Sequence, residues 1–118
     1  MAEFTRVCGS AEVLEGGLKE VQLGAQELCL ARVEGKLYAV DNRCPHLKAR
    51  LSNGSLAGTV LTCPWHGSRF DLRDGLVVEW TPALPGVVRP IARLIRRPKG
   101  LRTYEVREEG EDVAVRFG

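Results

Sequence analysis

The sequence has no long apolar run and little excess of either charge. None of its 118 residues belongs to a stretch near the roughly 20 apolar residues that a membrane-spanning helix needs, and the N-terminus lacks the basic start and apolar core of an export signal. The net charge of +2 does not favour nucleic acid or anionic lipid as a partner. We therefore expect a cytoplasmic, unexported protein that binds neither nucleic acid nor membrane.

Histidine and cysteine are also scarce, with two and four residues respectively. In the reducing cytosol, so few cysteines are more often metal ligands or free thiols than a disulfide framework. Two of the four stand outside any motif. We interpret Cys29, which lies in an apolar strand pattern, as a small buried hydrophobe, and assign no role to Cys8.

The charges are unevenly distributed along the chain. Six basic residues and no acidic ones lie within residues 80–104, which leaves eleven basic and fifteen acidic residues elsewhere. The six are Arg89, Arg93, Arg96, Arg97, Lys99 and Arg102. Such a segment can steer an acidic partner, although a charged run is more often a solvated face.

Short alternating segments separated by turn residues predict an all-β fold. They cover residues 3–7, 18–23, 27–33, 36–40, 56–62, 69–71, 76–79, 102–107 and 112–116. Glu34-Gly35, Asp74-Gly75 and Glu109-Gly110 are the expected turns. Four prolines between 82 and 98 leave room for at most one helical turn, at 91–97. Because there is no internal repeat or linker, residues 1–118 are expected to form one domain.

Two predicted loops, at about 41–54 and 62–75, each carry one cysteine and one histidine. The first contains CPH and the second, after sixteen intervening residues, CPWHGS. The four candidate ligands are Cys44, His46, Cys63 and His66. Two thiolates and two imidazoles can bind zinc, but zinc fingers usually take their thiolates from one hairpin and their histidines from a helix. A mixed pair in each loop suits a [2Fe-2S] cluster in which one iron takes both cysteines and the other both histidines.

The whole pattern, CPH followed at this spacing by CPWHGSRFDLRDG, resembles the cluster-binding region of the Rieske family, in particular of Rieske-type ferredoxins. The match spans about residues 41–80. The resemblance implies a small antiparallel β-sandwich or barrel with one [2Fe-2S] cluster per chain. It also implies that Cys44 and Cys63 bind the inner iron. His46 and His66 would then bind the outer iron near the surface, where electrons enter and leave.

Residues around the ligands are expected to shape this site. Pro45 and Pro64 fix the backbone after each ligand cysteine, and Gly67 permits a turn that other residues resist. The aromatic Trp65 either shields the cluster or docks a partner. By the resemblance, Pro82 lies in a loop that covers the cluster.

The resemblance also bears on the reduction potential. High-potential members of the family carry a disulfide at the positions of Ala49 and Trp65, and a tyrosine at that of Phe70. Ser68 is retained and can hydrogen-bond a bridging sulfide. We therefore expect a potential toward the low end of the roughly −150 to +300 mV range of Rieske centres.

These features predict a monomeric one-electron carrier and not an enzyme. Once both histidines are used as ligands, no nucleophile with a base, phosphate loop or mononuclear iron triad remains. The expected partners are a reductase and a terminal oxidoreductase such as a ring-hydroxylating oxygenase. The alternatives are a small Rieske subunit of a multi-chain oxidoreductase of the nitrite-reductase type, and a zinc-binding interaction module.

Overall fold

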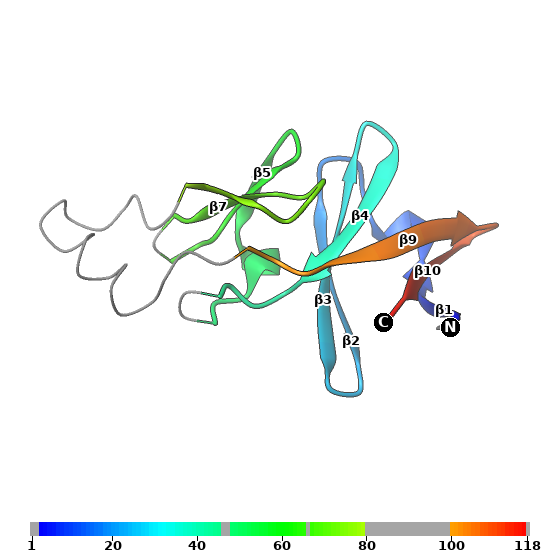
Figure 1. The fold of residues 1–118 in the computed structure, drawn as a ribbon. Helices are drawn as coiled ribbons and strands as arrows, with labels where there is room; N and C mark the ends of the chain where they lie inside the picture. Colours follow the sequence, from blue (N-terminus) through cyan, green and yellow to red (C-terminus); the bar gives the residue numbers. More distant parts are fainter. Residues whose placement is uncertain (1–2, 46–47, 66, 80–99, 118) are drawn as a thin grey trace, which may run out of the picture.

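The structure, a computed structural model, describes residues 3–45, 48–65, 67–79 and 100–117. These residues form ten β-strands in two antiparallel sheets, so the expected all-β fold is confirmed (Figure 1). The helical turn predicted at 91–97 and Pro82 lie outside the described residues. Within the described ranges, no helix is long and apolar enough to cross a bilayer.

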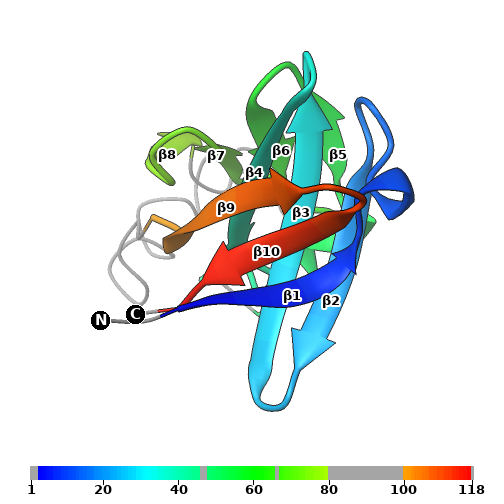
Figure 2. The same ribbon diagram turned by 90° about the vertical axis from the view of Figure 1, so that its right-hand side faces the viewer.

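The larger sheet has six strands in the order β1-β10-β9-β4-β3-β2, and it curves until its edge strands β1 and β2 come near each other (Figure 2). Its strands are β1 (Phe4–Gly9), β2 (Leu18–Leu23), β3 (Gln26–Val33), β4 (Lys36–Asp41), β9 (Thr103–Glu109) and β10 (Asp112–Arg116). Glu34 and Gly35 both have positive φ, 50° and 78°. They therefore form the tight two-residue turn predicted between β3 and β4.

The smaller sheet has four strands in the order β5-β6-β7-β8. They are β5 (Ser55–Ala57), β6 (Val60–Thr62), β7 (Arg69–Asp71) and β8 (Val77–Glu79). The prediction of one strand over 56–62 is wrong, because the chain reverses at Gly58, whose φ is +58°, so that β5 pairs with β6. The last hairpin turn also lies one residue later than predicted, at Gly110 and Glu111.

Two 3-10 turns, η1 (Ser10–Glu12) and η2 (Leu51–Asn53), are features that the sequence did not predict. Three residues are too few to show a helical period. η2 lies inside the first predicted loop and gives that loop a defined end.

Strand β3 separates two cores, because its side chains alternate between the two faces of the larger sheet. Leu28 and Leu30 belong to the core inside the curved sheet, whereas Cys29 and Ala31 belong to the core between the two sheets. All four residues are at most 1% exposed. The core between the sheets is the one that the two predicted loops border.

Candidate metal centre

Two of the four predicted ligands, Cys44 and Cys63, lie in the described part of the structure and belong to one buried core. Cys44 comes three residues after β4, and Cys63 directly follows β6. The two residues are 1% and 4% exposed. The fold thus brings the thiols of two separate loops into one apolar core. His46 and His66 lie outside the described residues.

The first loop is closed at its base by backbone hydrogen bonds. Arg43 and Arg50 pair as an isolated antiparallel bridge, and within it the Cys44 N–H donates to the Ala49 carbonyl at 2.8 Å. The Lys48 N–H donates back to the Cys44 carbonyl, also at 2.8 Å. Both backbone polar groups of Cys44 are therefore engaged, which holds the backbone at this predicted ligand in place.

Arg43 fastens this loop to β3. Its guanidinium donates to both carboxylate oxygens of Glu27, at 2.6 and 3.3 Å, and to the Lys48 carbonyl at 3.1 Å. The hydrogen bond with Arg43 lowers the pKa of Glu27 below its ordinary value and raises the pKa of Arg43. Both side chains therefore stay ionised at neutral pH. Their two parallel hydrogen bonds fix the orientation of the Arg43 guanidinium relative to β3.

Asn42 is a structural residue of the first loop that the sequence pattern did not reveal. It is fully buried, its N–H donates to the Glu27 carbonyl, and its carbonyl accepts from the Leu51 N–H at 2.9 Å. Its side-chain oxygen accepts from the Ser52 N–H at 2.8 Å. Asn42 therefore ties the start of the first loop to η2 at its end. The Asn42 Nδ2 has no hydrogen-bond partner among the described residues.

The second loop is a tight connection between β6 and β7. The Cys63 N–H donates to the Ser68 carbonyl at 2.8 Å, just inside the paired residues Thr62 and Arg69. Gly67 has a φ of +75°, as expected for a residue that permits an unusual turn.

Side chains of the second loop divide between the core and the surface. Ser68 and Phe70 are 1% and 0% exposed. Trp65 is 59% exposed and Pro64 is also exposed, which favours partner docking over shielding as the role of Trp65.

The two loops meet at a glycine. Gly54, directly after η2, lies so close to β6 that an added Cβ would be 2.0 Å from the Thr62 carbonyl oxygen. No other residue type fits this contact without movement of the backbone. Because Thr62 precedes Cys63, the close approach of Gly54 sets the position of one loop relative to the other.

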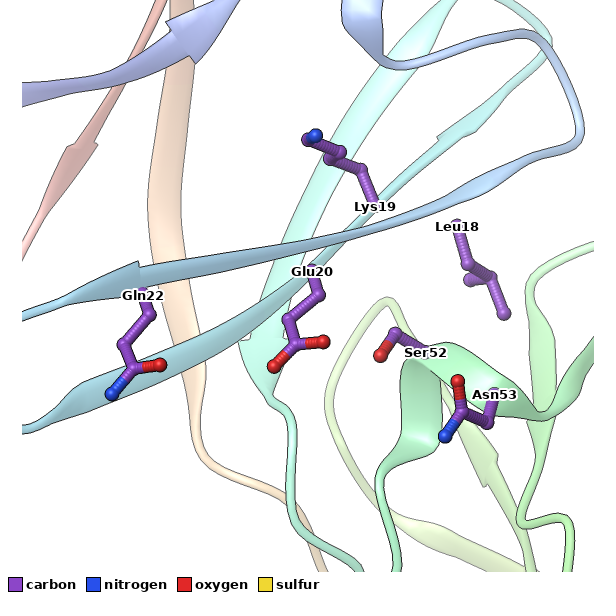
Figure 3. A pocket seen from close by; sticks show the side chains of 6 residues that line it. All are labelled: Leu18, Lys19, Glu20, Gln22, Ser52 and Asn53. Carbon is purple, nitrogen blue, oxygen red and sulfur yellow. The ribbon is translucent and has the colours of Figure 1, made fainter.

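A pocket of about 460 Å³ lies beside the first loop, between the edge strand β2 and η2 (Figure 3). Its lining residues are Leu18, Lys19, Glu20, Gln22, Ser52 and Asn53. Glu20 forms an ion pair with Arg50 at 3.5 Å, so the acid in this wall already has a partner. We assign this pocket no chemistry.

Other titratable clusters do not compete with this site. Among the residues that the structure describes, no group of three or more His, Cys, Asp and Glu side chains gathers as a metal site. Cys8 and Cys29 are buried outside the two loops, and burial raises the pKa of Cys29 to about 12. The interpretation of Cys29 as a buried hydrophobe is confirmed. Of the basic segment, only Arg102 is described.

The family comparison covers most of the chain. The Rieske [2Fe-2S] domain family matches residues 3–105, a range that includes both loops and all four predicted ligands. The chain therefore belongs to the Rieske [2Fe-2S] domain family. This confirms the resemblance that the two motifs indicated.

Several individual relatives are named as ferredoxins. The chain is 35% identical over 104 residues to the naphthalene 1,2-dioxygenase system ferredoxin component of Pseudomonas aeruginosa, covering 88% of this chain and 86% of the relative. The ferredoxin of Sphingomonas yanoikuyae B1 matches with a TM-score of 0.79 at 26% identity, covering 98% of this chain and all of that one. A chain from the complex of reduced oxygenase and oxidized ferredoxin in carbazole 1,9a-dioxygenase matches with a TM-score of 0.75 at 28% identity, covering 96% and 92%.

Proposed function

We propose that this chain is a Rieske-type ferredoxin that takes one electron from a reductase and delivers it to the terminal oxygenase of an aromatic-ring dioxygenase system. The observation that carries the proposal is the burial of Cys44 and Cys63, from two separate loops, in one core. The relatives support this role, because they are named as ferredoxin components and one structure is a ferredoxin–oxygenase complex. Such a component carries electrons and is not itself the catalyst. We propose that it acts as a single-domain monomer in the cytoplasm.

We further propose that Cys44 and Cys63 bind one iron of a single [2Fe-2S] cluster and that His46 and His66 bind the other. The donor set of two thiolates and two neutral imidazoles fits this centre. Its surroundings fit as well, because the two cysteines are buried while Trp65, two residues after Cys63 in the second loop, is exposed. When bound, the cluster would supply a one-electron couple.

The described side chains account for a rigid and largely apolar site. The Cys44 and Cys63 backbones are fixed by hydrogen bonds to Ala49 and Ser68. Phe70, fully buried beside the same core, offers no hydroxyl. Apolar surroundings disfavour the extra negative charge of the reduced state, which supports a potential toward the low end of the Rieske range.

The proposal is tested on purified protein by iron and acid-labile sulfide analysis and by electron paramagnetic resonance of the reduced state. We expect two irons and two sulfides per chain, and loss of the Rieske signal in His46→Ala and His66→Ala. Cys8→Ala is the matched control, since it removes a buried thiol outside both loops and should keep the cluster. A colourless protein with one zinc would overturn the proposal.

The redox role needs a separate measurement. Reduced protein mixed with a terminal oxygenase should be reoxidised, and the oxygenase should turn over its aromatic substrate only when the reductase and this chain are both present. Purification as part of a stable multi-chain complex would instead favour the oxidoreductase subunit.

A further inference from the structure

Lys48, in the first loop, has a backbone conformation that is unusual for its residue type. Its φ is +63°, and among the described residues only Glu34 shares a positive φ without being glycine. The left-handed region is unfavourable for any residue with a Cβ, because the Cβ crowds the following carbonyl. Such a conformation persists only where the surrounding structure determines it, and it is found often at functional sites.

Two contacts hold Lys48 in this conformation. Its N–H donates to the Cys44 carbonyl at 2.8 Å, and its carbonyl accepts from the Arg43 guanidinium at 3.1 Å. Arg43 is held in turn by the bidentate pair with Glu27. The backbone of Lys48 is therefore tied directly to a proposed cluster ligand, which fixes the point in the first loop from which its side chain starts.

No ion pair among the residues that the structure describes neutralises the charge of Lys48. Its side chain is exposed, whereas the neighbouring cations Arg43 and Arg50 are paired with Glu27 and Glu20. All fifteen acidic side chains of the chain lie among the described residues, and none of the ion pairs they form there includes Lys48. Lys48 is therefore the one cation without an ion pair among the described residues of the first loop, and it lies four residues from Cys44.

We infer that the positive charge of Lys48 raises the reduction potential of the cluster. This inference rests on the proposed function. In the step concerned, one electron leaves the reductase, which is oxidised, and enters the cluster, which gains one unit of negative charge. No bond or proton is involved. A fixed positive charge nearby stabilises the reduced state relative to the oxidised state, and so favours reduction.

The expected size follows from Coulomb's law. Two unit charges about 10 Å apart, at an effective dielectric constant of about 50, change an equilibrium constant about threefold. For a one-electron couple, at 59 mV per tenfold, this is about 28 mV. The effect should diminish as salt is added, because the charge is exposed to solvent.

The experiment compares midpoint potentials of the holoprotein at low ionic strength in Lys48→Arg, Lys48→Asn and Lys48→Glu. Asn removes the charge and tolerates a positive φ, so a change in potential is not caused by backbone strain. We expect Lys48→Arg to keep the wild-type midpoint potential. The equilibrium constant for reduction of the cluster should fall about threefold in Lys48→Asn and about ninefold in Lys48→Glu.

Glu34→Asn is the matched control. It also replaces a charged residue with positive φ, but in the turn at the far end of β4 from Cys44, about 17 Å along the strand. Its potential should equal that of the wild type.

An unchanged potential in Lys48→Asn, with iron content and Tm retained, would overturn the inference and leave the proposed function intact. A shift of the same size but opposite sign in Glu34→Asn, which removes a negative charge, would overturn it as well, because net charge alone would then explain the result. Wild-type protein without iron would overturn both proposals.

Discussion

Replacing Gly54 by alanine is expected to disturb both loops at once. The added Cβ would lie 2.0 Å from the Thr62 carbonyl oxygen and 3.0 Å from that of Leu51. The φ of Gly54 is −84°, which alanine adopts readily, so the clash alone opposes the substitution. An ordinary contact of about 3.5 Å requires the two segments to separate by about 1.5 Å more.

That separation moves a proposed ligand, because Thr62 directly precedes Cys63. Overpacking of this kind typically costs about 1–3 kcal/mol. For a domain of this size we expect a fall in Tm of roughly 5–10 °C. Ligand sets generally tolerate displacements of only about 0.5 Å, so Gly54→Ala should also bind less iron.

The assay is iron and sulfide content per chain, together with thermal unfolding followed by circular dichroism. Gly58→Ala is the matched control, since its Cβ would meet nothing within 4 Å and only the φ of +58° opposes it. We expect that control to lose about 1 kcal/mol and to keep its iron. Gly54→Ala with wild-type Tm and full iron content would refute the reasoning, as would equal iron loss in both variants.

Three further predictions concern single buried or partly buried groups. Hydrogen bonds from Arg73 lower the pKa of Asp71 from 3.8 to about 2, so ionised Asp71 stabilises the fold above about pH 4 and this contribution is lost as pH falls toward 2. Arg73 is 66% exposed, so solvent screens the pair and the effect is small. Between pH 5 and pH 3, the free energy of unfolding in urea should fall by on the order of 0.5 kcal/mol less in Asp71→Asn than in the wild type. Identical pH profiles would contradict this. Cys29, with a pKa of about 12, should resist iodoacetamide at pH 8 in the native protein and react after unfolding, as mass spectrometry of its peptide can show. Asn42→Ala leaves the Ser52 N–H without its acceptor and should cost about 1–3 kcal/mol in urea unfolding, and no change would mean that the bond contributes nothing.

Local features of the sequence determined much of this protein. Period-two alternation located most strands. Glu34-Gly35 indicated its turn, because the type I′ hairpin turn has positive φ at both central positions and glycine adopts such a φ without strain. The candidate ligands were also readable, since each histidine stands beside a cysteine at a spacing particular to one kind of centre. These are properties of short segments, which do not depend on distant contacts.

Only the tertiary structure decided which residues meet across the fold. The segment 56–62 reads as one strand, yet Gly58 splits it into two, because pairing β5 with β6 and β6 with β7 buries Leu61 and Phe70 in the core between the sheets. The buried role of Asn42 and the close approach of Gly54 to Thr62 likewise depend on long-range packing. A sequence pattern records the preference of a segment for one face or turn, whereas register and contact are settled by the segments packed against it.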